Sequence, residues 1–219
     1  MKALLACVGI LLAALVCQAG EAEKLLRQVR NAFQSRDLWE LSFEQQQLPQ
    51  HGTDTLRTRG RLLACPDGSF RVDMEGMHLL SDGKSLWRWE DGGAQVLLEK
   101  PGQSEDVLLP HQLLILVEER FKPQSLKSAG PRRKLMRLSP RSGSEFMREV
   151  QLTLQKEKDQ WWPRDVAFTD FTDTRMRFVV LKRQSWPNRG VKAKELAFRL
   201  PAGMELVDLR PGAGGGGRP

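Results

Sequence analysis

The sequence contains no tyrosine and has only three histidines and three cysteines. Two cysteines lie in the first twenty residues, so Cys65 is the single thiol of the rest of the chain, and we expect no internal disulfide framework. The histidines at 51, 78 and 111 have no histidine, cysteine or carboxylate at metal-ligand spacing. We therefore expect neither a metal site nor a cofactor.

Motifs of catalysis are also missing. There is no G-x-S-x-G elbow, and the match of Gly212, Gly214 and Gly217 to G-x-G-x-x-G has no strand before it and no helix after it. Asp170 and Asp173 bracket a threonine-rich turn, which is typical of turn-forming aspartates. The net charge of +7 is spread along the chain without a basic helix. We expect a protein that is not an enzyme and does not bind nucleic acid.

The N-terminus has the composition of an export signal. A short positive start is followed by residues 3–17, which are apolar without interruption. This run is shorter than the about 20 residues of a membrane span. We interpret residues 1–19 as a secretory signal peptide, cut after Ala19 or Ala22, with a retained anchor as the alternative. Acylation of Cys17 is a further alternative, although a valine precedes it.

Periodicity predicts one helix followed by a meander of strands. Residues 23–36 place apolar side chains on one helical stripe. From Leu38 to residue 99 short alternating runs predict about six strands. The turns between them are predicted at Asp67-Gly68, Ser81-Asp82-Gly83 and Asp91-Gly92-Gly93.

A second helix and a second group of strands follow. Residues 105–119 read as a helix that is firm at about 111–119, because Pro110 would kink a helix interior. About five strands are expected afterwards, the last at residues 194–201, and the Gly-rich residues 211–219 are expected to be disordered. The pattern predicts an α+β, mainly β chain with a strongly curved sheet or open barrel of about 11 strands. Whether its apolar face is filled or hollow stays open.

Several sequence blocks occur in an order that points to a known family. They are Phe43-Glu44-Gln45, Gly60-Arg61-Leu62, Cys65-Pro66, Phe70-Arg71, the S-D-G-K-S-L-W block from Ser81 to Trp87, the Leu-rich segment from Leu108, Leu138-Ser139-Pro140, and the ending from Phe198 to Asp208. Over about residues 22–210 the chain resembles the LolA-type outer-membrane lipoprotein carriers of Gram-negative bacteria.

The resemblance implies an unclosed antiparallel β half-barrel whose apolar concave face is covered by helices and holds the acyl chains of a lipoprotein. The implied cavity residues are Phe43, Leu62, Phe70, Val72, Met74, Leu86, Trp87, Trp89, Val150, Leu152, Phe168, Phe178 and Val180. The implied lid residues are Leu25, Val29 and Phe33 on the first helix, and Leu109, Leu113, Leu114 and Leu116 on the second.

The same resemblance implies a function. Residues 20–210 would form a monomeric periplasmic carrier that takes lipoproteins from an inner-membrane ABC transporter to an outer-membrane receptor lipoprotein. The alternative is a regulatory or receptor module of the same fold without shuttle activity. Cys65 departs from the family pattern. Many family members have a basic residue at this position, directly before the proline, and that basic residue contacts the lid helices. Arg59, Arg61 and Arg71 are the candidates to replace it.

Overall fold

A computed structural model describes residues 20–48, 54–101, 115, 117–141, 147–170 and 172–212. The signal peptide at 1–19 and most of the second helix predicted at 105–119 lie outside the described residues. In the described ranges no helix is long and apolar enough to cross a membrane.

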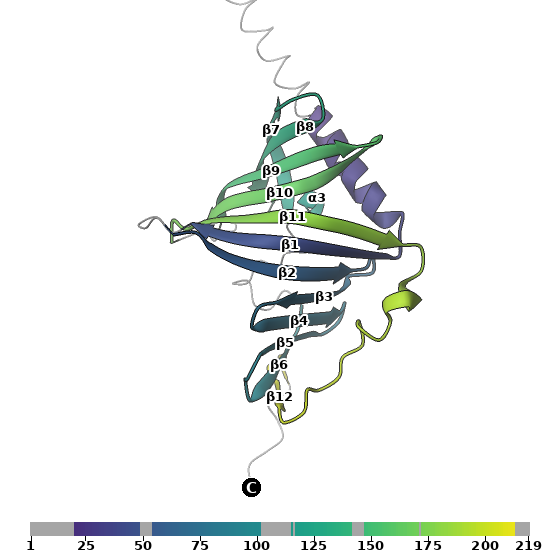
Figure 1. Cartoon of the computed structure of the whole chain (residues 1–219), viewed down its shortest axis with the longest axis vertical. Coiled ribbons are helices and arrows are strands. Elements are labelled where there is room, and N and C mark those ends of the chain that lie inside the picture. The colour runs from purple at the N-terminus through teal and green to yellow at the C-terminus, as the bar shows by residue number, and fades with distance from the viewer. Residues whose placement is uncertain are drawn as a thin grey trace, which may run out of the picture. The chain divides into compact units, whose positions relative to one another are not determined.

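Twelve strands are hydrogen-bonded into one sheet (Figure 1). They are β1 (Leu38–Leu48), β2 (Leu56–Ala64), β3 (Ser69–Met74), β4 (Met77–Asp82), β5 (Leu86–Glu90), β6 (Gln95–Glu99), β7 (Phe121–Ser128), β8 (Arg133–Pro140), β9 (Met147–Glu157), β10 (Gln160–Asp170), β11 (Arg175–Trp186) and β12 (Glu205–Asp208). The strand order is β12-β6-β5-β4-β3-β2-β1-β11-β10-β9-β8-β7, so the sheet is unclosed in the described part of the chain. The prediction of a mainly β fold with an open, largely antiparallel sheet is confirmed, with twelve strands instead of about eleven.

Helices are few among the described residues. One covers residues 20–34, close to the predicted range of 23–36. The others are the four-residue helix α3 (Val117–Arg120) and the 3-10 helix η1 (Arg189–Lys192). Two compact units divide the chain: unit 1 contains residues 1–32, 47–55 and 112–179, and unit 2 contains residues 33–46, 56–111 and 180–219.

Unit 1 has one continuous apolar sheet face. Its central row of paired residues, one from each strand from β7 to β11, is Leu126, Met136, Leu152, Val166 and Phe178. All five are buried, and Met136 and Leu152 are 0% exposed. Because side chains alternate along a strand, the opposite face takes the polar residues.

The helix of residues 20–34 buries its apolar stripe in unit 1. Leu25, Leu26 and Val29 are buried. Glu21 forms an ion pair with Lys134 of β8, and Arg30 Nε lies 3.2 Å from Glu118 of α3. Lys134 is paired with Leu154 in the sheet register, and Leu154 is 0% exposed. These contacts attach the helix to β8 and α3 on the apolar side of the sheet.

A bulge changes the facing of one strand end. Strict alternation along β9 places Met147 opposite to Val150, but Met147 is buried. Glu149 has a positive φ of 54°, and the register with β10 shifts between Ala167 and Thr169. The extra residue turns Met147 onto the buried face, because a bulge interrupts the period of two.

Unit 2 contains the meander from β2 to β6 and part of β1. On its apolar face Phe43 of β1 lies over Gly60 of β2, which pairs with Met74 of β3. A Cβ on Gly60 would stand 2.8 Å from Phe43 Cε2, so only glycine leaves room for this ring. In each of the three predicted turns one glycine has a positive φ: 87° at Gly68, 85° at Gly83 and 73° at Gly92.

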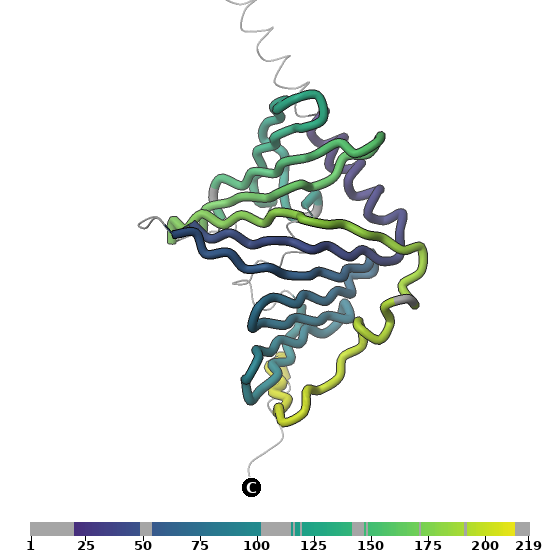
Figure 2. Tube along the Cα trace, viewed as in Figure 1, coloured from purple at the N-terminus to yellow at the C-terminus, as the bar shows by residue number. Residues whose placement is uncertain are grey.

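The C-terminal segment differs from the prediction. Residues 194–201 form no strand, and instead run past the strands of unit 2 to β12, as the yellow trace of Figure 2 shows. β12 pairs with β6 in parallel. Phe198 stacks on Trp87 of β5 at 4.7 Å between ring centroids. The alternation of Leu196, Phe198 and Leu200 therefore reflects packing on a sheet face and not a ladder of backbone hydrogen bonds, and the closing strand predicted here is wrong.

Candidate functional site

The acyl-binding candidates on unit 1 share its apolar face. Leu152 and Phe178 belong to its central paired row, and Val150 and Phe168 lie two residues along from members of that row. The four side chains are at most 5% exposed. The rings of Phe168 and Phe178 stack with centroids 6.4 Å apart.

The candidates on unit 2 divide between two faces of its sheet. Leu62 pairs with Val72, and Phe70 pairs with Ser81, which pairs with Leu86. These four apolar residues share the face of Phe43, and each is at most 6% exposed. Met74 lies on the same face and is half-buried. Val180 on β11 is buried as well.

The two tryptophans point the other way. Trp87 directly follows Leu86 in β5, and neighbouring residues of a strand face opposite sides. Trp87 pairs with Leu80, and Trp89 pairs with His78. Both indoles are half-buried and contact Phe198 of the C-terminal segment. Trp87 and Trp89, which the resemblance implied as cavity residues, therefore lie on the face opposite to that of Leu86.

The structure describes the lid candidates of the first predicted helix. Leu25, Val29 and Phe33 are buried at 4%, 4% and 6% exposure. The ring of Phe33 lies 6.0 Å from that of Trp39, whose Nε1 donates to the Phe33 carbonyl at 2.7 Å. Leu109, Leu113, Leu114 and Leu116 of the second predicted helix lie outside the described residues.

Cys65 occupies the position at which many LolA-type carriers have a basic residue, and it faces away from the apolar side of unit 2. Cys65 packs in a cluster with Leu38 and Leu63, against which Trp186 and Leu196 pack. Leu63 pairs with Arg71, on the side opposite to Leu62. Cys65 is 5% exposed, and burial raises the pKa of its thiol to about 11. The side chain is therefore a buried apolar group in the ground state and not a reactive thiolate.

Arg59, Arg61 and Arg71, the candidates to replace the missing basic residue, pair with acidic residues of unit 2. Arg61 Nε donates to Glu40 at 2.6 Å, and its Nη1 pairs with Glu195 of the C-terminal segment. Arg71 Nε donates to Asp73, and Arg59 lies 3.8 Å from Glu44. Because Arg61 and Arg71 stand on the same side as Leu63, they hold the C-terminal segment and not a lid over the apolar face.

A charged pair that sequence reasoning missed lies on the apolar face of unit 2. Arg88 pairs in register with Leu79 and Leu97, and its Nη2 donates to Glu99 at 2.8 Å. Glu99 is 3% exposed. A buried carboxylate needs such a partner, because desolvation of an unpaired charge is costly. The signal in the sequence was the break in apolar alternation at Arg88 within L-W-R-W-E.

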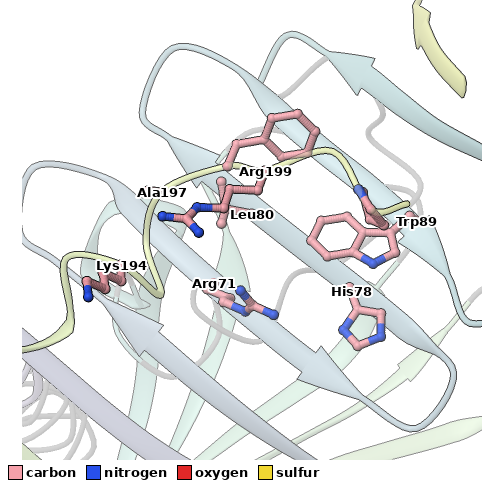
Figure 3. A pocket seen from close by; sticks show the side chains of 9 residues that line it. Arg71, His78, Leu80, Trp89, Lys194, Ala197 and Arg199 are labelled. Carbon is pink, nitrogen blue, oxygen red and sulfur yellow. The ribbon is translucent and has the colours of Figure 1, made fainter. Parts of the chain in front are cut away.

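A cleft of about 310 Å³ opens on the opposite face of unit 2, beneath the C-terminal segment. Figure 3 shows Arg71, His78 and Trp89 rising from the strands, and Lys194 and Arg199 coming from the segment that crosses them. Leu80, Ala197, Phe198 and Pro201 complete the lining. In the described part of the chain no histidine, cysteine and carboxylate side chains gather in a group that could hold a metal.

Comparisons with known proteins identify the fold. No family model matches the chain, and no curated protein matches its sequence. A solved DUF1329 family protein from Desulfovibrio piger has a TM-score of 0.52 at 8% identity, covering 82% of this chain and 97% of that one. A LolA superfamily protein from Nitrosomonas europaea has a TM-score of 0.45 at 11% identity, covering 77% and 93%. A Vibrio parahaemolyticus domain named for outer membrane lipoprotein sorting has a TM-score of 0.38 at 11% identity, covering 80% and 99%. The fold of this chain is therefore similar to that of the DUF1329 family protein.

Proposed function

We propose that this chain is a periplasmic carrier that binds the acyl chains of lipoproteins on an apolar sheet face beneath the helix of residues 20–34. The supporting observation is the row of buried apolar residues across β7–β11, which is covered by a helix with an apolar stripe. The ordered LolA-type motifs of the sequence support the same assignment. An inner-membrane ABC transporter would load this carrier, and an outer-membrane receptor lipoprotein would unload it.

The helix has to move for an acyl chain to reach this face, because the face is already buried. Uncovering Leu25, Leu26 and Val29 costs about 5–9 kcal/mol at ~1.5–3 kcal/mol for each side chain. Burying an acyl chain of ~15 carbons contributes on the order of 10 kcal/mol. The two magnitudes are close, so the exchange of helix for lipid can run in both directions, as a carrier requires. The ion pairs of Glu21 with Lys134 and of Arg30 with Glu118 oppose the movement.

Native mass spectrometry of the mature protein with membrane vesicles that contain a triacylated lipoprotein tests the proposal. We expect a soluble one-to-one complex in the supernatant. The matched control is the same lipoprotein with its acylated cysteine replaced by serine, which should form no complex. If the acylated lipoprotein stays in its membrane, the carrier function is wrong and a sensor or receptor of the same fold is the better assignment. An intact-mass measurement that shows an acyl group on Cys17 would identify the protein as an acylated receptor.

A cross-link tests the movement of the helix. The variant Glu21→Cys/Lys134→Cys, joined by a short bismaleimide, ties the helix to β8 at the site of the observed ion pair. We expect it to lose loading, whereas the same variant without the reagent should load. Loading by the cross-linked protein would show that lipid enters without displacement of the helix.

A further inference from the structure

The cleft beneath the C-terminal segment lies on unit 2, on the face opposite to its apolar face, whereas the proposed acyl-binding face lies on unit 1. Arg71 pairs with Leu80 and Leu80 pairs with Trp87, on the side of the sheet opposite to Val72 and Leu79. The cleft volume of about 310 Å³ equals roughly ten water molecules at ~30 Å³ each. It therefore has room for a group larger than a single ion.

Hydrogen bonds hold one guanidinium of the cleft in place. Arg71 Nε donates to both carboxylate oxygens of Asp73, at 3.0 and 2.9 Å, and Nη1 donates to the main-chain carbonyl of Glu195 at 3.3 Å. The guanidinium also lies 6.0 Å from the centre of the Trp89 ring. Within the described residues, Nη2 of Arg71 has no hydrogen-bond partner. A fixed arginine of this kind loses little side-chain entropy when it binds an anion.

The carboxylates next to the cleft are already paired with basic side chains, and one of them, Asp73, is paired with Arg71 of the cleft itself. Asp73 accepts from Arg71 and lies 2.9 Å from His78 Nδ1, and Asp91 lies 2.9 Å from His78 Nε2. Glu195 pairs with Arg61 and with Lys192. The lining of the cleft itself contains no carboxylate.

Two further cations of the lining form no ion pair in the described part of the chain. Lys194 and Arg199 are exposed and belong to the C-terminal segment that crosses the cleft. Together with Arg71 they present only donors, since neither guanidinium nor ammonium groups accept hydrogen bonds. Three cationic donors around one cavity suit a doubly charged oxyanion better than a single carboxylate, because each can hydrogen-bond a different oxygen.

The aromatic groups limit which part of a ligand can enter. The Trp89 ring is stacked on His78 with centroids 5.1 Å apart, and Phe198 meets its edge at 6.4 Å. Room for a second stacked ring is therefore restricted, which favours a compact substituent over an aromatic one.

We infer that this cleft binds a phosphate group carrying a small polar substituent, held by Arg71, Lys194 and Arg199. The ligand is a glycerol phosphate type of anion, either free or as the headgroup of a phospholipid. The site belongs to unit 2, whereas the proposed acyl-binding face belongs to unit 1, so the inference does not depend on the proposed carrier function.

Calorimetric titration of the mature protein with glycerol 3-phosphate tests the inference, with glycerol as the uncharged comparison. Co-sedimentation with phosphatidylglycerol vesicles, compared with phosphatidylcholine vesicles, forms the second arm. The variants Lys194→Gln and Arg199→Gln should each weaken binding about tenfold, the effect of one lost charge-assisted hydrogen bond. The matched controls Lys182→Gln and Arg175→Gln remove the same charges from exposed positions of β11 and should bind as the unmodified protein does.

The outcomes separate the two sources of phosphate. Binding of glycerol 3-phosphate that is weakened when Lys194 or Arg199 is replaced supports a site for the free anion. Binding to phosphatidylglycerol vesicles alone, with the same dependence, supports a headgroup site. The inference is overturned when neither probe binds, or when the two cleft variants bind as tightly as the two controls. Lipoprotein loading should be unchanged in the cleft variants, so a failure of this inference leaves the carrier proposal untouched.

Discussion

The replacement Gly60→Ala probes the contact that positions Phe43 on the apolar face of unit 2. The added Cβ would overlap Phe43 Cζ and would stand 2.8 Å from Phe43 Cε2 and 2.9 Å from Met74 Cγ. Phe43 is 0% exposed, so its ring has little space into which it can move. The φ of Gly60 is not in the left-handed region, so the conflict is one of space and not of backbone strain.

The expected loss of stability follows from two opposing terms. Overpacking of a well-packed core costs about 1–3 kcal/mol. Replacing glycine by alanine returns about 0.4–1 kcal/mol, because the unfolded chain loses conformational freedom. We expect a net destabilisation of about 1–2 kcal/mol, which lowers the melting temperature by about 2–8 °C in a domain of this size.

A double-mutant cycle with Phe43→Leu measures the contact directly. Urea unfolding of the mature protein, followed by circular dichroism, gives the free energy of unfolding of each variant. Because leucine lacks the outer ring atoms, Gly60→Ala should cost little in the Phe43→Leu background, and the coupling should lie in the ~0.5–3 kcal/mol range of contacting residues. Additive effects of the two replacements, or a Gly60→Ala protein as stable as the unmodified one, would refute the placement of the ring.

Three further predictions concern titratable groups. Hydrogen bonding to Arg61 lowers the pKa of Glu195 from 4.5 to about 2, so this contribution to stability is present above pH 4.5 and is lost as the pH falls toward 2. The protection factors of the amides of residues 194–204, measured by hydrogen exchange and corrected for the intrinsic rate at each pH, should fall over that range, and Glu195→Gln should remove this fall. Burial disfavours the His78 imidazolium, but hydrogen bonds to its two aspartates raise the pKa above 6.5. Its stabilisation is complete below pH 6.5 and is lost as the pH rises through the folded value, and nuclear magnetic resonance should give a lower pKa in Asp91→Asn. The Cys65 thiol, with a pKa of about 11, should react with a disulfide reagent only in denaturant, and rapid reaction of the native protein would contradict its burial.

The strands and turns of unit 2 could be predicted because their signals are local. Asp82 accepts from the amides of Lys84 and Ser85, and Gly83 adopts a positive φ, so the S-D-G-K turn forms from its own residues. The bulge at Glu149 could not be predicted, since an alternating sequence contains no mark of an inserted residue. The role of residues 194–201 was hidden for a related reason. An alternating apolar pattern fits a strand and also fits a segment that packs onto a sheet.

The candidate site also has features that the sequence predicts and features that it does not. Leu152 and Phe178 could be placed on one face because alternation along a strand determines the side to which each residue points. The sequence by itself thus determined a mainly β chain, the apolar face of regular strands such as β11, and an order of motifs that resembles LolA-type carriers. The tertiary structure alone decided that Trp87 and Trp89 face the C-terminal segment, that Arg71 lines a basic cleft, and that Cys65 is buried away from the apolar face. These features depend on residues more than a hundred positions apart, such as Arg71 and Glu195, which only the folded sheet brings into contact.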